Sequence, residues 1–269
     1  MGLIGIQPLI DIVTLSLQSV FLKNEKNGVS LLLIGKPETA KTSTIFTFNN
    51  LDFVAYYDEI TQKKLIDEFL PLVKAGQKRT LLIPDIINCI EKQKPTREQF
   101  LNTIKSGIDD TGIVQISTYY KQVYKLIEGL RFNIITAITV DNYKKLEKYL
   151  KNTGLLSRFV PFSYDYPIDK VKKIFNYIEG SEVSDEVQIK EIVKEETEIP
   201  SNPNLFKEFE IISTKLGSQY SGFGLRAQIN FQRLAKANAL LNRRKEITHE
   251  DIEKVLHLSN WINFDFNPL

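Results

Sequence analysis

An apolar run that breaks abruptly into a short loop is the feature that most constrains how this chain can fold. The run 31–34 is followed by Gly-Lys-Pro-Glu-Thr-Ala and then by Lys-Thr-Ser. This order is typical of a phosphate-binding loop between a buried strand and a helix, where backbone N–H groups surround the phosphates of a nucleotide. The predicted nucleotide-binding residues are Gly35, Lys36, Pro37, Glu38, Thr39, Ala40, Lys41, Thr42 and Ser43.

The pattern also predicts what individual side chains do, with ATP and Mg²⁺ as the cofactors. Lys41 is expected to reach the β- and γ-phosphates and the Thr42 hydroxyl to bind Mg²⁺, with Ser43 as the weaker alternative. Ala40 departs from the pattern, because glycine normally stands at this position. Its methyl group disfavours a positive φ. We therefore expect nucleotide binding only if φ at Ala40 is negative.

Composition limits the class of protein. The 269 residues suit one domain of typical size and a smaller second one. The formal net charge is +2, so any contact with nucleic acid must come from a local patch. Cys89 is the single cysteine, and two histidines are present, which excludes an internal disulfide and a Cys/His zinc site. No apolar run approaches the ~20 residues that span a bilayer, so we expect a cytoplasmic protein without membrane contact.

Strand and helix signals alternate along the first part of the chain. After an amphipathic helix over 6–22, strands are predicted at 31–35, 53–57, 80–83, 132–139 and 159–164. Several of these runs are apolar throughout, which indicates a parallel sheet with helices on both faces. We therefore predict an α/β core over residues 1–166.

The second part, 167–269, is predicted to be helical. Helices are expected at 205–216, 224–242 and 248–260, the last with a capping box formed by Thr248 and Asp251. Between the core and these helices the chain is rich in glutamate, from about 179 to 204. A run of like charge is usually an exposed face, so we expect a solvated insertion there.

Nucleotide hydrolysis also needs a carboxylate near Mg²⁺, at the end of a neighbouring buried strand. Asp85 follows the strand 80–83 and is predicted to hold the metal. The next residue is Ile86, which cannot act as a base. Either another carboxylate serves or hydrolysis is slow. Glu59 is a candidate substitute, although Asp58 and Glu59 are better explained as a turn or a helix cap.

With these motifs the chain resembles an AAA+ ATPase over almost its whole length. The resemblance implies a P-loop NTPase fold with a five-stranded parallel sheet and, over 167–269, an all-helical lid. The segment 131–139 looks like the fourth strand of that sheet, and the polar "sensor 1" residue at its end would be Thr139, with Asn142 as the alternative.

Two further segments carry the resemblance. In 154–159, Arg158 matches an arginine finger that reaches the γ-phosphate of a neighbouring subunit, which implies a homo-oligomer, a ring or a filament. A surface salt bridge is the alternative role for Arg158. In 222–240, Arg226 matches the "sensor 2" arginine of the lid, whereas Arg233 lies two turns further along the helix and is expected to be too far from the phosphates.

The branch suggested is that of the minichromosome-maintenance proteins and magnesium chelatases, because 243–252 resembles their lid pattern and 106–125 looks like their pre-sensor-1 hairpin. Aromatic residues interleaved with lysines suit stacking on bases and contact with phosphates. A purely structural hairpin or helix explains this segment equally well. Asp109 or Asp110 is a further candidate for the missing glutamate. The candidate nucleic-acid contacts are Tyr119, Tyr120, Lys121 and Lys125.

Two functions follow. The first is ATP-driven remodelling of, or movement along, nucleic acid, of helicase or replication-initiator type, which Arg158, Arg226 and the hairpin favour. The second is an ATP-dependent switch or assembly factor that acts on a protein partner and hydrolyses weakly, which Ala40 and Ile86 favour.

Overall fold

The computed structural model describes residues 5–118, 121–181 and 187–264, and within 115–126 it describes the backbone alone. Five parallel strands form one sheet in the order β2-β3-β6-β1-β7. All five predicted strands are present, within one residue of the expected bounds. They are β1 (Ser30–Gly35), β2 (Val54–Tyr56), β3 (Thr80–Ile83), β6 (Asn133–Thr139) and β7 (Phe159–Ser163).

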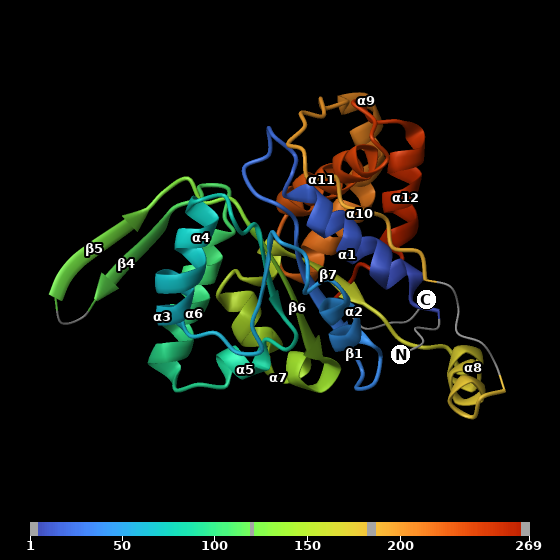
Figure 1. The fold of residues 1–269 in the computed structure, drawn as a ribbon, viewed down its shortest axis with the longest axis horizontal. Helices are drawn as coiled ribbons and strands as arrows, with labels where there is room; N and C mark the ends of the chain where they lie inside the picture. Colours follow the sequence, from blue (N-terminus) through green and yellow to red (C-terminus); the bar gives the residue numbers. More distant parts are fainter. Residues whose placement is uncertain (1–4, 119–120, 182–186, 265–269) are drawn as a thin grey trace.

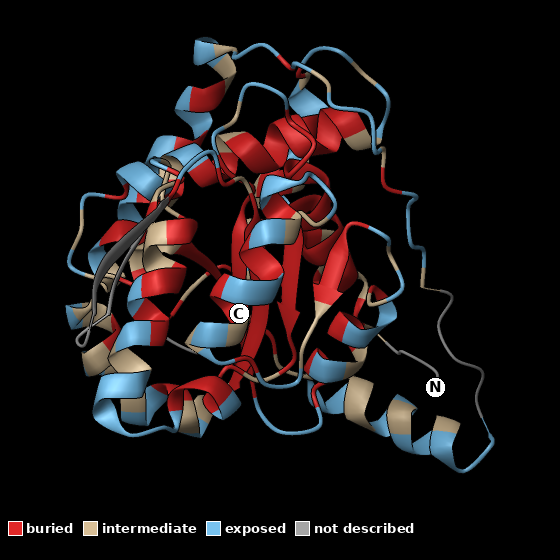
Figure 2. Cartoon of the chain, turned by 60° about the vertical axis from the view of Figure 1, so that its left-hand side comes forward, coloured by how far each residue is buried: buried red, intermediate tan, exposed pale blue. Residues whose placement is uncertain are grey.

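Helices flank this sheet and bury its strands, as Figure 2 shows. The helices of the core are α1 (Gln7–Ser19), α2 (Lys41–Thr47), α3 (Gln62–Lys64), α4 (Leu70–Lys74), α5 (Ile87–Ile90), α6 (Lys94–Gly107) and α7 (Val140–Asn152). Helix α1 is shorter than predicted, and ten of its 13 residues are buried. It contacts strands of the sheet on one side and a helix of the C-terminal region on the other, which explains why apolar residues surround its axis.

The C-terminal region is helical, as predicted. Its helices are α9 (Pro203–Phe206), α10 (Glu210–Gln219), α11 (Leu225–Leu241) and α12 (His249–Ser259). Helix α11 packs against α1, α10 and α12. The predicted capping box is confirmed: the backbone N–H of Thr248 donates to the Asp251 carboxylate at 2.9 Å, and the Thr248 hydroxyl accepts from the backbone N–H of Asp251.

The glutamate-rich segment is attached to the core at a few points. Helix α8 (Ile168–Ile178) follows β7 and projects from the body with no buried residue (Figure 1). After it, the chain from 187 to 202 runs back along α1 with Ile192 and Ile199 buried. Glu196 forms an ion pair with Arg79 at 2.5 Å. The glutamates at 191, 195, 196 and 198 are exposed, in agreement with the expected solvated face, while the two buried isoleucines and the ion pair attach the stretch to the core.

A two-stranded antiparallel hairpin extends from the opposite end of the molecule (Figure 1). It consists of β4 (Val114–Thr118) and β5 (Lys121–Ile127), so the predicted hairpin is present. Lys121 and Lys125 belong to β5. Tyr119 and Tyr120 lie outside the described residues. In the described part of the chain, no helix has the length and apolar character needed to cross a membrane.

Candidate functional site

The loop between β1 and α2 adopts the bend of a phosphate-binding loop. Glu38 and Ala40 both have left-handed backbone conformations, with φ of 65° and 58°. The condition stated for nucleotide binding, a negative φ at Ala40, is therefore not met, and alanine takes the left-handed conformation that glycine adopts readily at such a position. A left-handed conformation costs an L-residue about 1–2 kcal/mol, so the surrounding loop imposes the bend on alanine. Gly35 is needed for a close approach, because a Cβ there would lie 2.6 Å from the Thr39 hydroxyl oxygen.

Lys41 is folded into this loop and is only 8% exposed. Its ammonium group donates to the carbonyl oxygens of Gly35 (2.9 Å) and Lys36 (2.5 Å) and to the hydroxyl of Thr39 (3.0 Å). Burial lowers the pKa of Lys41 to about 8, and the negative charge of Asp85 partly offsets this effect. The loop thus holds a cation on oxygen acceptors that phosphate oxygens can replace.

Asp85 lies just beyond the end of β3, beside the phosphate-binding loop. Its Oδ1 accepts a hydrogen bond from the backbone N–H of Ile87 at 3.0 Å. Burial raises the pKa of the Asp85 carboxyl, while this hydrogen bond and the charge of Lys41 lower it. Ile86 points into the core and is buried, so the side chain that follows Asp85 serves packing.

Thr139 completes a cavity of about 210 Å³ at this edge of the sheet. The parallel register pairs Thr139 with Gly35, which places the end of β6 beside the start of the loop. The Thr139 hydroxyl also accepts from the backbone N–H of Asn142 at 3.4 Å and so caps α7. The lining residues are Pro37, Glu38, Thr39, Ala40, Lys41, Thr42, Ser43, Pro84, Asp85, Ala137, Ile138 and Thr139.

The other candidate carboxylates lie elsewhere. Glu59 forms an ion pair with Lys92, and the Asp58 carboxylate accepts from the hydroxyl of Tyr56 at 2.8 Å. Neither lines the cavity, whose carboxylates are Glu38 and Asp85. Sequence reasoning missed Asp165, which pairs with Lys36 at 2.6 Å. Its position just after β7 was the available signal, because β7 ends at the same edge of the sheet as β1.

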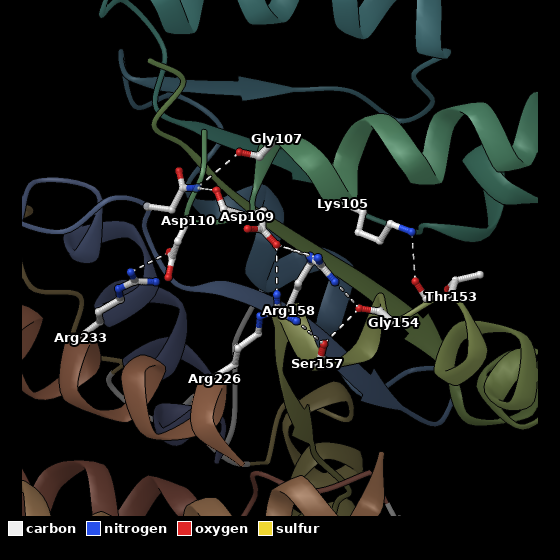
Figure 3. A network of polar contacts seen from close by, with 11 residues as sticks. Lys105, Gly107, Asp109, Asp110, Thr153, Gly154, Ser157, Arg158, Arg226 and Arg233 are labelled. Atoms are coloured by element: carbon white, nitrogen blue, oxygen red, sulfur yellow. Dashed lines mark hydrogen bonds and ion pairs between the residues drawn. The ribbon is translucent and has the colours of Figure 1, made fainter. Parts of the chain in front are cut away.

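Arg158 and Arg226 meet at one carboxylate, as Figure 3 shows. Arg158 lies in a 3₁₀ turn (Leu156–Arg158) before β7 and binds Asp109 Oδ2 through Nε (3.1 Å) and Nη2 (2.6 Å). Arg226, in the first turn of α11, donates to the same oxygen through Nη2 at 3.1 Å. Burial and the neighbouring charge of Arg226 lower the pKa of Arg158, and Asp109 raises it.

This arginine pair and the cavity lined by Lys41, Asp85 and Thr139 lie at opposite edges of the sheet. Gly35 ends β1 at the cavity, whereas Phe159, which follows Arg158, pairs with Ser30 at the start of β1. The six residues of β1 separate the two edges by roughly 16 Å. The structure therefore does not bring Arg158, Arg226 or Asp109 into this cavity of their own chain.

Arg233 lies deeper between the lid and the core. It binds Glu25 at 2.9 Å and Asp110 at 2.8 Å, and Lys236 binds the same Glu25 at 2.7 Å. Burial raises the pKa of Glu25, but the hydrogen bonds and charges of Lys236 and Arg233 outweigh that effect and lower the pKa overall. Arg233 thus joins the lid to the loop before β1, and Asp110 is engaged in the same contact.

Comparison with known families places a lid domain within this geometry. Residues 214–259, which include α11 and α12, match the family model of the AAA lid domain. No curated protein matches the chain. Together with the parallel sheet and its flanking helices, the lid match is consistent with an α/β P-loop fold of AAA+ type and supports an AAA+ ATPase family for this chain. Proteins of that family generally use ATP and Mg²⁺ and commonly form oligomers.

Proposed function

We propose that this chain is an ATPase that binds ATP·Mg²⁺ in the cavity formed by the phosphate-binding loop, Asp85 and Thr139, and that neighbouring copies share this site. The observation that carries the proposal is the convergence of Lys41, Asp85 and Thr139 on one cavity. The residues that line the cavity fit ATP·Mg²⁺. The loop keeps its glycine-like bend at Ala40, and the donor set of hydroxyl and carboxylate oxygens suits Mg²⁺.

Each residue of the cavity has a role in this proposal. Lys41 exchanges its carbonyl partners for phosphate oxygens, while the Thr42 hydroxyl and the Asp85 carboxylate hold the metal. The Thr139 hydroxyl, at the end of β6, orients water at the cavity. When bound, ATP would supply the phosphoryl group, and Mg²⁺ would supply the positive charge that neutralises it. Because Ile86 is buried and carries no carboxylate, hydrolysis in this proposal is slow.

The arginine pair supports a shared site. Arg158 and Arg226 lie at the edge opposite their own cavity, so any nucleotide they contact belongs to another copy of the chain. Next to Arg226, Phe223 and Leu225 are 89% and 72% exposed. In this proposal a second copy covers these apolar side chains and brings its bound phosphates to the arginines. Such a head-to-tail contact builds a ring or a filament.

Steady-state ATP hydrolysis by the purified protein tests the proposal, with Lys41→Ala as the blank. Arg158→Ala is expected to abolish turnover without weakening ATP binding, and mixing it with Lys41→Ala subunits is expected to restore part of the activity. The absence of restoration in a demonstrably mixed assembly would disprove the shared site. Unchanged ATP affinity in Lys41→Ala would disprove the nucleotide cavity.

We further propose that the hairpin couples ATP use to nucleic acid, as in helicases or replication initiators. The support is its projection from the body, with Lys121 and Lys125 on β5 (Figure 1). This function predicts turnover stimulated by single-stranded DNA and salt-sensitive DNA binding that the Lys121→Ala/Lys125→Ala double variant weakens. DNA binding that changes neither with salt concentration nor in the double variant would count against this function.

The alternative function is an ATP-dependent switch or assembly factor acting on a protein, and the buried Ile86 after Asp85 favours it. The same hydrolysis assay separates the two. ATP binding without turnover, with or without DNA, is the result expected of the switch.

A further inference from the structure

We propose that Asp109 is a positioning residue, which holds Arg158 and Arg226 together as one unit that faces the nucleotide of a neighbouring copy. This inference rests on the proposed function, because it presumes a site shared between subunits. In this inference Asp109 contacts neither ATP nor Mg²⁺ but determines the positions of the Arg158 and Arg226 side chains.

The first support is the geometry around a single oxygen. Three N–H donors from two guanidinium groups converge on Asp109 Oδ2, at 2.6, 3.1 and 3.1 Å. The side chains of Asp109 and Arg158 are 19% and 16% exposed, so solvent screens their ion pair only in part. Without the carboxylate, Arg158 and Arg226 would be left as two like charges in direct proximity, and each would move away from the other.

The second support is that both sides of the contact are held in place. The buried Asn27 amide donates to the backbone carbonyl of Asp109 at 2.6 Å, and its Oδ1 accepts from the backbone N–H of Phe132 at 3.1 Å. On the other side, Arg158 Nη1 donates to the carbonyl of Gly154 at 2.7 Å. Arg226 Nη1 donates to the hydroxyl of Ser157 at 3.1 Å. Groups fixed before a ligand arrives need little reorganisation to stabilise it.

The third support is the donor capacity that these contacts leave. A guanidinium carries five N–H donors, and the bonds to Asp109 and Gly154 engage three of those on Arg158. Two positive charges against one carboxylate also leave a net charge of about +1 on this unit, which still attracts a phosphate. Asp109 therefore orients the pair without cancelling its charge.

Asp109→Asn tests the proposal, because it removes the charge but keeps the size of the side chain. The expected result is a fall in kcat of at least about tenfold, with KM for ATP within about twofold of the wild type, since the neighbour's loop binds the nucleotide. Asp109→Glu is expected to recover part of kcat. The matched control is Asp110→Asn, which should keep wild-type kcat because Arg233 retains Glu25.

Mixing Asp109→Asn with Lys41→Ala separates positioning from a general defect of folding. An interface with the loop of an Asp109→Asn subunit and the arginines of a Lys41→Ala subunit has every required group intact. In a random equimolar mixture such interfaces make up about one quarter, so about one quarter of wild-type turnover is expected. A misfolded Asp109→Asn subunit would lose its own loop as well and give no recovery.

The outcomes are distinct. If kcat of Asp109→Asn is unchanged or higher, or if it falls and mixing does not restore it, Asp109 does not position the arginines. This conclusion requires that Arg158→Ala mixed with Lys41→Ala does recover turnover in the same assay. Failure of that second mixture instead overturns the shared site itself, and the role of Asp109 falls with it.

Discussion

Raising the pH from 7 to 9 is expected to weaken ATP binding about tenfold, because of one buried lysine. The pKa of Lys41 in the empty loop is lowered to about 8 by burial, against the attraction of Asp85. Phosphate oxygens favour the ammonium form, so the pKa of Lys41 is higher with nucleotide bound. Binding therefore takes up a proton wherever the pH lies between these two values, and affinity falls as the pH rises through about 8.

The magnitude follows from the fraction of Lys41 that is protonated. With a pKa of about 8, this fraction is about 0.9 at pH 7 and about 0.09 at pH 9, a loss of about 1.4 kcal/mol in binding free energy. A lysine with an ordinary pKa near 10.4 would stay almost fully protonated over this range. The nucleotide contributes little, because a terminal phosphate with a pKa near 6 is already deprotonated at pH 7.

Isothermal titration with ATP at both pH values measures this effect, and repeating it in two buffers of different ionisation enthalpy counts the protons. About 0.9 proton should be taken up per ATP bound at pH 9. Lys41→Arg is the matched control. Arginine stays charged from pH 7 to 9, so the affinity of this variant for ATP should not vary over this range. A wild-type Kd that changes by less than about twofold, or an equal change in Lys41→Arg, would refute the reasoning.

Three further predictions concern the backbone, the lid and the subunit contact. Ala40→Gly should raise stability by up to about 1 kcal/mol and tighten ATP binding, since glycine avoids the left-handed strain, whereas Ala40→Val should do the opposite in thermal melts with and without ATP. Glu25→Gln should cost about 2–3 kcal/mol at pH 7, because Arg233 and Lys236 lose a buried carboxylate. Because the pKa of folded Glu25 lies below 4.5, this difference in denaturant unfolding should begin to shrink below about pH 4.5, where the unfolded chain takes up a proton, and vanish as the pH falls through the lower pKa of the folded state. Phe223→Ser should shift the ATP-bound protein toward monomer in light scattering while leaving ATP affinity unchanged, and an unaltered mass would remove this side chain from the contact.

The sequence predicted the elements whose signals are local. The five strands appear where apolar runs lie between turn residues, and the capping box of Thr248 and Asp251 forms as its spacing implies. The cavity was also predictable. Lys41, Asp85 and Thr139 each stand next to a strand end, and the carboxyl ends of parallel strands share one edge of the sheet.

Local patterns do not show what depends on distant parts of the chain. Residue propensity predicts a negative φ at Ala40, but the rest of the loop imposes φ of 58°. The glutamates of 187–202 are exposed, as their run predicts, but the local pattern does not show that buried isoleucines and the ion pair with Arg79 attach this segment to the core. At Ala40 the contacts of the loop outweigh a backbone preference that is worth only about 1–2 kcal/mol.

The sequence by itself thus determined the α/β core, the cavity at the carboxyl ends of its strands and the helical C-terminal region, because apolar periodicity and residue spacing act over short stretches of chain. Only the tertiary structure decided which charged side chains come into contact. Asp109, Arg158 and Arg226 are separated by 49 and 68 positions along the chain, and nothing in the local sequence pairs them. Their contact arises because the base of the hairpin, the turn before β7 and the start of α11 converge at the amino-terminal edge of the sheet. There the largely buried Arg158 needs a carboxylate partner, and the exposed Arg226 reaches the same one.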